Sequence, residues 1–129
     1  MLSAELKSEL LAIVDRLAEL QRQNNEIRRQ ELEIQDRMAV IRAKDLVAIA
    51  FAKDNKDKPL YSNERIRDAA LVTALDEDAE YRALQAQFRS MEEKRQEVSI
   101  EATRLSDRKS LLMFEAGWMP PPAQEAPIL

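Results

Sequence analysis

The sequence contains no cysteine, no histidine and a single glycine among its 129 residues. Without cysteine there is no disulfide, thiolate metal site or cysteine nucleophile, which is compatible with a reducing cytoplasm. Without histidine the chain lacks the most frequent general base and the most frequent metal ligand. One glycine cannot form a phosphate-binding glycine loop. We therefore expect no catalytic residues, no cofactor and no metal site.

Compact β folds are also excluded, because the chain has too few turn glycines and only three Phe, two Tyr and one Trp. The net charge of −4 and the pI near 5.0 leave no global basic field for a nucleic-acid backbone. Near the N-terminus Glu5, Glu9 and Asp15 interrupt every apolar run before it reaches the length of a signal-peptide core or a membrane span. We expect a soluble, cytoplasmic protein without a membrane partner.

What the sequence does contain is a long heptad repeat from Leu6 to about Ala52. The d positions are Leu6, Ile13, Leu20, Ile27, Ile34, Ile41 and Ala48, and the a positions are Leu10, Leu17, Asn24, Glu31, Met38, Asp45 and Ala52. A helix with such a stripe cannot bury it alone, so the repeat predicts packing against at least one partner helix.

A second heptad repeat begins at Tyr81. Its a positions are Tyr81, Phe88, Arg95, Ala102, Lys109 and Ala116, and its d positions are Leu84, Met91, Val98, Leu105 and Leu112. Between the two repeats, residues 53–61 favour a turn and contain Pro59. Ser62 or Asn63 is expected to cap the next helix, and the acids at 76–78 predict a kink or break near residues 75–77.

Two repeats of matching period joined by a short connection predict an all-α fold, a long antiparallel helical hairpin or coiled coil over residues 1–116. Its arms are residues 3–52 and 62–116, its loop is 53–61, and a kink or short extra helix lies near 63–76. Gly117 is expected to end the second arm in a left-handed conformation. Residues 117–129 form an extended proline-rich tail, where Trp118 and Met119 either pack on the helix end or insert into a partner. The run of prolines is also compatible with a docking motif.

We call the row of a and d residues of each repeat its seam. The charged residues in the two seams have opposite signs. The first arm carries Asn24, Glu31 and Asp45, and the second arm carries Arg95 and Lys109. A charge at a core position needs a partner or a path to solvent. Folding back at the loop brings the middles of the arms together, so Glu31 and Arg95 either pair or extend separately into water. Asn24 is the type of seam residue that fixes register or oligomeric state. These five residues are the expected determinants of register and partner choice.

Two basic sites are candidates for contacts with phosphate or an acidic partner. Lys53, Lys56 and Lys58 lie in the loop, where ordinary solvation is the simpler interpretation. Arg82 and Arg89 lie beside Tyr81 and Phe88, a combination that could bind single-stranded nucleic acid by stacking. Because both aromatic residues occupy a positions, we favour the interpretation that they belong to the core.

Several large apolar residues of the first arm lie outside the a and d positions: Val14, Leu32, Val40, Leu46, Val47, Ile49 and Phe51. A single partner helix would leave part of this surface exposed, and exposed apolar patches favour association. We therefore expect a homo-oligomer.

Residues 58–95 begin Lys-Pro-Leu-Tyr-Ser-Asn-Glu-Arg, continue with a helix of small residues, and then contain Leu-x-x-Asp and Tyr. This segment resembles a recurrent pattern in small coiled-coil proteins of phages and prophages. The resemblance implies a phage or prophage origin. The genes of such proteins lie among genes for recombination and for handling single-stranded nucleic acid, and the proteins themselves have no assigned activity. By architecture alone, the chain is also similar to the hairpin stalk proteins of type III secretion ATPases.

The sequence thus predicts a non-enzymatic structural or adaptor protein that assembles with protein partners through coiled-coil helix packing. The alternatives are an accessory protein for single-stranded nucleic acid or recombination, and a stalk-like hairpin of a secretion ATPase.

Overall fold

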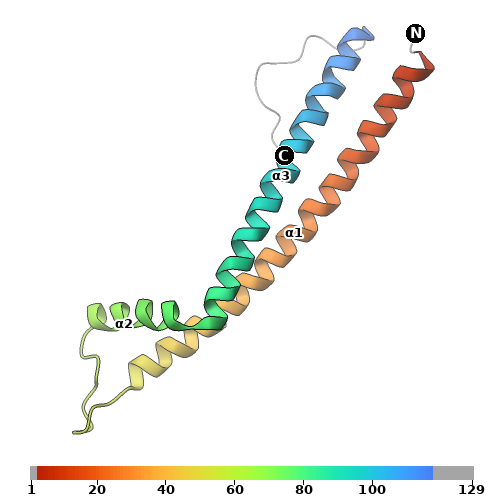
Figure 1. The fold of residues 1–129 in the computed structure, drawn as a ribbon. Helices are drawn as coiled ribbons and strands as arrows, with labels where there is room; N and C mark the ends of the chain where they lie inside the picture. The colour runs from red at the N-terminus through yellow and green to blue at the C-terminus, as the bar shows by residue number, and fades with distance from the viewer. Residues whose placement is uncertain (1–2, 118–129) are drawn as a thin grey trace. The chain divides into compact units, whose positions relative to one another are not determined.

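The computed structural model describes residues 3–117, and over this range the protein is all-α (Figure 1). The helices are α1 (Ala4–Phe51), α2 (Glu64–Glu77) and α3 (Ala79–Glu115). The expected all-α fold class, with a short extra helix before the second long one, is confirmed. The chain divides into two compact units. Among the described residues, unit 1 comprises 3–29 and 92–117, and unit 2 is Gln30–Met91.

Short polar side chains cap the first two helices. The Ser3 hydroxyl accepts a hydrogen bond from the backbone N–H of Leu6 at 3.1 Å. Asn63 has extended backbone geometry, and its side-chain oxygen accepts from the backbone N–H of Ile66 at 2.9 Å. Each bond satisfies a backbone donor that the first helical turn leaves unpaired. Of the two residues expected to cap the second helix, Asn63 is therefore the cap.

The break between α2 and α3 lies at Asp78, one residue beyond the expected segment. Asp78 is extended, and its carboxylate accepts a hydrogen bond from the backbone N–H of Tyr81 at 3.0 Å. An aspartate that caps a new helix interrupts the old one without glycine or proline. At the other end of α3, Gly117 has φ 77° and its N–H donates to the carbonyl of Phe114, which is the expected left-handed ending.

Asp54 organises the loop that follows α1. Its carboxylate accepts hydrogen bonds from the backbone N–H groups of Lys56 and Lys58 at 2.9 and 3.0 Å. An isolated antiparallel bridge joins Lys53 to Pro59. Asp57 occupies the left-handed region with φ 63°, which aspartate tolerates better than most residues. The connection is therefore a hydrogen-bonded turn.

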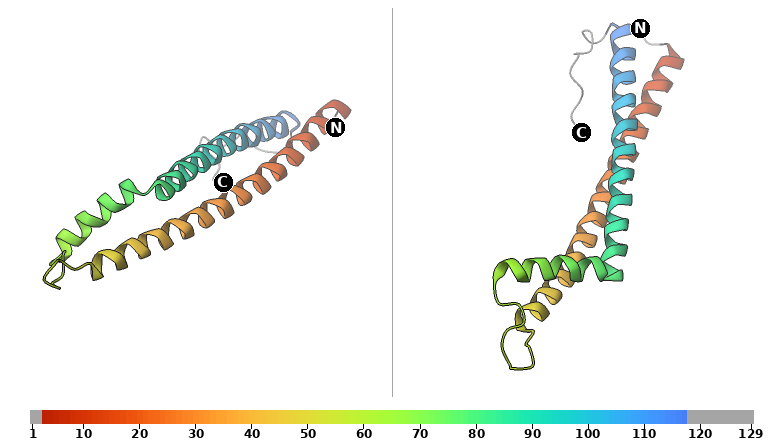
Figure 2. Two further views of the ribbon diagram at one scale, coloured as in Figure 1. Left: turned by 60° about the horizontal axis from the view of Figure 1, so that its bottom comes forward. Right: turned by 60° about the vertical axis from the view of Figure 1, so that its left-hand side comes forward.

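In unit 1 the first half of α1 lies beside the last part of α3, and the two run in opposite directions (Figure 2). Leu20 is 1% exposed and is the most deeply buried side chain of the described residues. The other buried apolar residues of this unit are Ile13, Ile27, Ala102 and Leu112. Complete burial of a leucine or isoleucine side chain stabilises a fold by roughly 1.5–3 kcal/mol relative to an exposed position.

Two ion pairs join the helices of unit 1 in one antiparallel register. Arg16 makes hydrogen bonds of 2.9 and 3.0 Å from Nη2 to the two carboxylate oxygens of Glu101. Arg108 lies 3.0 Å from the carboxylate of Glu9. The residue numbers of each pair, 16 with 101 and 9 with 108, total 117, as one antiparallel alignment requires.

The core of unit 2 is a single apolar cluster. Its buried members are Ile34, Ile41, Ile49, Leu71, Leu75 and Leu84, and its partly buried members include Tyr81, Phe88 and Met91. All three helices contribute to the cluster. The short helix α2 provides Leu71 and Leu75.

The heptad assignment of the first arm is confirmed from Ile13 to Ile41 and is wrong at its end. The d residues from Ile13 to Ile41 are all buried, but Ala48 is exposed and Ile49 is 8% exposed. The expectation that Ile49 adds to the exposed apolar surface is therefore also wrong. A straight helix drifts against a repeat of 3.5 residues, and burying isoleucine rather than alanine removes more apolar area from water.

Candidate interaction surfaces

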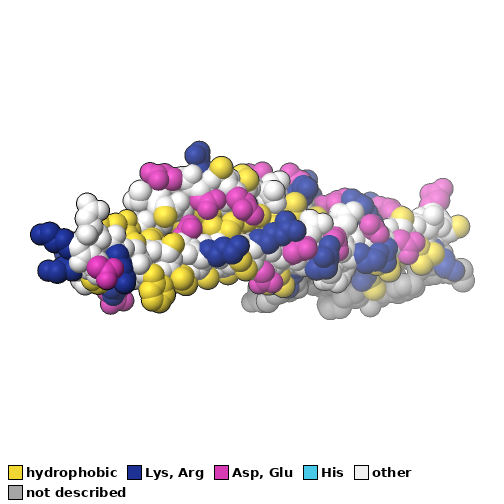
Figure 3. Space-filling model, turned by 90° about the horizontal axis from the view of Figure 1, so that it is seen from below, with side chains coloured by type: hydrophobic (Ala, Val, Ile, Leu, Met, Phe, Trp, Pro, Cys, Tyr) yellow, Lys and Arg dark blue, Asp and Glu magenta, His cyan; other side chains and the backbone are white. Residues whose placement is uncertain are grey.

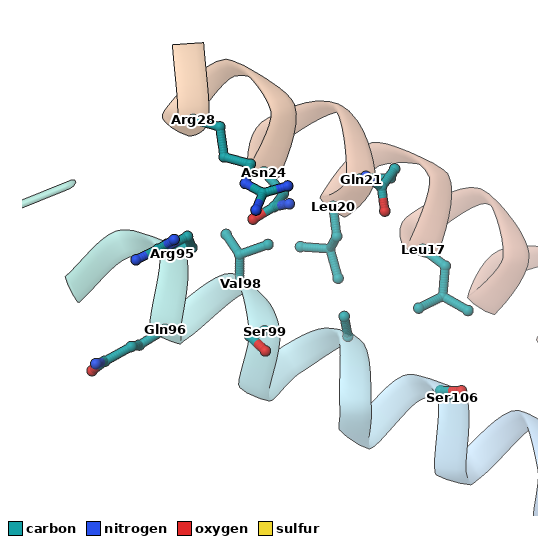
Figure 4. Close-up of a pocket in the computed structure, with 11 residues that line it drawn as sticks. Leu17, Leu20, Gln21, Asn24, Arg28, Arg95, Gln96, Val98, Ser99 and Ser106 are labelled. Carbon is teal, nitrogen blue, oxygen red and sulfur yellow. The ribbon is translucent and has the colours of Figure 1, made fainter. Parts of the chain in front are cut away.

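An open groove of about 550 Å³ lies between α1 and α3 in unit 1. Leu17, Leu20, Val98 and Ala102 provide its apolar lining, and its polar lining includes Asn24, Arg28, Arg95 and Ser99. Figure 4 shows Arg28 lying beside Asn24 on α1 and Val98 directed from α3 towards Leu20. Small side chains on α3, among them Ser99 and Ser106, leave this space between the helices. Arginine and amide groups suit a carboxylate or a phosphate, but the groove does not enclose a ligand as small-molecule pockets do.

The five polar seam residues occupy different environments. Asn24 and Arg95 line the groove of unit 1. Lys109 belongs to the same unit and is half-buried outside that groove. In unit 2, Glu31 is 7% exposed and Asp45 is half-buried. The structure places Glu31 in one unit and Arg95 in the other, and the pairing of these two residues stays a prediction.

Asp45 has one carboxylate oxygen, Oδ2, that is buried and accepts no hydrogen bond from the described residues. A buried polar atom without a hydrogen bond costs about 1–3 kcal/mol. We therefore expect Asp45 to lower the stability of unit 2, as a residue with a role in specificity would.

Both basic sites are at the surface of unit 2. Lys53, Lys56 and Lys58 are exposed, and Lys53 lies 3.4 Å from the carboxylate of Asp57. Arg82 and Arg89 line one shallow groove of about 450 Å³ together with alanines of the same helix. The structure thus brings the two arginines of α3 to one surface.

The aromatic neighbours of these arginines are both partly buried. Tyr81 and Phe88 pack against the apolar cluster of unit 2. This agrees with the interpretation that both residues belong to the core.

Large apolar side chains are exposed on every described helix. Figure 3 shows apolar side chains at the surface of one face of the molecule. Six of the seven residues expected at the surface of the first arm are exposed by 43–75%: Val14, Leu32, Val40, Leu46, Val47 and Phe51. Sequence reasoning missed others, including Leu11 and Val72, because it considered only the first arm and began at Val14. Five of the six, all except Val14, belong to unit 2.

Trp118 and Met119 lie outside the described residues. Within residues 3–117, no helix combines the length and apolar character needed to cross a membrane. The same part of the chain has no cluster of three or more acidic side chains that could hold a metal ion.

Comparisons with known proteins give no match to a protein-family model, to a curated protein or to a solved structure.

Proposed function

We propose that the protein is a non-enzymatic cytoplasmic adaptor that assembles with protein partners, including copies of itself, through coiled-coil helix packing. The observation that carries this proposal is the apolar surface left over after α1 has packed within its own chain. In unit 2 this surface includes Leu32 at 61%, Val47 at 56% and Phe51 at 75% exposure.

Association follows from the energetics of this surface. Removing an apolar side chain of this size from water contributes roughly 1.5–3 kcal/mol when burial is complete. For side chains that are more than 40% exposed, a large part of this stabilisation becomes available only when a partner buries them. Monomeric proteins rarely expose contiguous apolar patches of more than a few hundred Å².

The chemical inventory supports an adaptor rather than an enzyme. The chain has neither histidine nor cysteine, and both grooves described above are open to solvent. Catalysis needs groups held in a water-excluding site, where electrostatic stabilisation is strong. A phage or prophage origin, which rests on the resemblance of residues 58–95, belongs to the same proposal.

Sedimentation equilibrium at micromolar concentration tests the self-association. We expect a mass that is a multiple of the 14.9 kDa chain. A monomer over the whole concentration range would contradict the proposal.

The second candidate function is an accessory role in handling single-stranded nucleic acid, and the observation that favours it is the shared groove of Arg82 and Arg89. Phosphate contacts by such residues make binding strongly dependent on salt. Fluorescence anisotropy with a labelled oligonucleotide at low salt tests it. Binding that disappears in R82E/R89E would support this function, and absence of binding by the wild type would exclude it.

A further inference from the structure

One side of α1 in unit 2 forms a second apolar stripe, which we name the outer face: Ala39, Val40, Ala43, Leu46, Val47 and Phe51. Successive residues of this stripe are one, three or four positions apart, a spacing that keeps all six on one side of the helix. That side points away from the seam residues Ile34, Ile41 and Ile49, which are buried in the core of the unit. All six residues of the outer face are exposed.

We propose that the outer face binds the outer face of a second copy of this chain, with the two α1 helices antiparallel about a two-fold axis near residues 39–43. This inference deepens the proposed function and rests on it, because it names the surface and the geometry of self-association.

The charges around the outer face select this partner and this direction. Asp36 lies on the same side of the helix just before the stripe, while Arg42 and Lys44 flank it further along. In an antiparallel pair centred at residue 41, Asp36 of one copy faces residue 46 of the other, about 3 Å along the helix axis from Lys44 and about 6 Å from Arg42. A parallel pair would instead place Asp36 beside Asp36, and like charges across a helix interface are unfavourable.

The side-chain sizes fit a close approach at the centre of such a pair. Ala39 and Ala43 allow the two helix backbones to come together, while Leu46, Val47 and Phe51 supply apolar area towards the end of α1. The two-fold axis uses each of these residues twice, as an isologous interface does.

A matched pair of substitutions tests the surface. Val47→Glu places a charge in the outer face, whereas Val14→Glu makes the same change at an exposed valine of α1 in unit 1. We expect Val47→Glu to raise the dissociation constant of the dimer by about tenfold or more. Val14→Glu should change this constant by less than about twofold. Circular dichroism should show unchanged helix content in both, because both positions are exposed.

Single cysteines test the direction, since the natural chain has none. In the antiparallel pair, two copies of Ala43→Cys lie close together, while two copies of Ala50→Cys are separated by about 27 Å along the helix axis. We expect a short thiol-to-thiol crosslinker to join Ala43→Cys dimers and not Ala50→Cys dimers. It should also join Ala50→Cys to Leu32→Cys when the two variants are mixed.

The outcomes separate the two proposals. A monomeric wild type would overturn this inference together with self-association. A dimer that Val47→Glu leaves intact would overturn only the assignment of the outer face. Equal crosslinking of Ala43→Cys and Ala50→Cys would overturn the antiparallel direction.

Discussion

The ion pair between Arg16 and Glu101 offers a test of the antiparallel register of unit 1 through a double-mutant cycle. Its geometry is bidentate, with Nη2 of Arg16 at 2.9 and 3.0 Å from the two carboxylate oxygens and Nε at 3.1 Å from one of them. Both side chains are 44% exposed, so solvent screening reduces the interaction. Exposed pairs contribute about 0.2–1 kcal/mol, and a bidentate arginine belongs at the upper end. We expect a coupling free energy of about 0.5–1 kcal/mol.

The cycle uses Arg16→Gln, Glu101→Gln and the double variant, with the free energy of unfolding measured by urea denaturation at low salt. Because the Debye length falls to about 3 Å in 1 M salt, the coupling should shrink there. A control cycle combines Arg16→Gln with Glu93→Gln, which lies about 12 Å from Glu101 along α3 and should give no coupling. A coupling indistinguishable from zero for Arg16 and Glu101 at low salt would contradict the bidentate contact between these two side chains.

Four further substitutions and titrations probe individual sites. Leu20→Ala should lower the free energy of unfolding by about 2–4 kcal/mol in urea denaturation, because Leu20 is 1% exposed; a loss below about 1 kcal/mol would show that this core is not formed. Asp45→Ala should raise the free energy of unfolding by about 1 kcal/mol, because it removes a buried oxygen that has no hydrogen bond. A lower free energy of unfolding in this variant would contradict the expected cost of Asp45. Asp54→Ala should cost about 1 kcal/mol by removing two turn hydrogen bonds, and hydrogen exchange of the loop amides should accelerate; unchanged exchange would refute the role of this carboxylate. The hydrogen bond from Arg22 lowers the pKa of Glu19 below its ordinary value of 4.5, so the stabilisation is present above that value and lost as pH falls through the lowered pKa. NMR titration should show this shift and its loss in Arg22→Gln, and an unshifted Glu19 would contradict the contact.

The sequence was sufficient to predict the all-α fold and most of the buried seam, because a heptad of isoleucine and leucine leaves one way to bury large apolar area. The assignment of Ala48 to a buried d position was wrong, because burying a side chain as small as alanine gains little free energy and does not keep the heptad repeat in phase. Ile49 is buried in its place. It follows Asp45 by four positions, whereas the heptad repeat placed the next buried residue three positions after Asp45.

The break at Asp78 could be located only to within a few residues from sequence. Asp76, Glu77 and Asp78 are all plausible helix caps, and the choice among them depends on which carboxylate meets a free backbone donor. In the structure that donor is the N–H of Tyr81.

The groove of unit 1 was not predicted, because its volume depends on which small residues of α3 face α1. Ser99 and Ser106 are ordinary helix-surface residues by composition, and only the packing of the two helices in unit 1 shows that they line the same groove as Leu17 and Leu20. The apolar surface of the first arm was predictable in kind, since its residues lie off the seam. Its organisation into one outer face depends on an unbroken helix over residues 39–51, which lie within α1.

Sedimentation equilibrium of the wild type beside Val47→Glu tests the central claim, self-association through surplus apolar helix surface, most directly. We expect the wild type to sediment as a dimer at micromolar concentration and Val47→Glu to shift towards the monomer of 14.9 kDa. Monomers in both samples at every concentration would contradict the claim.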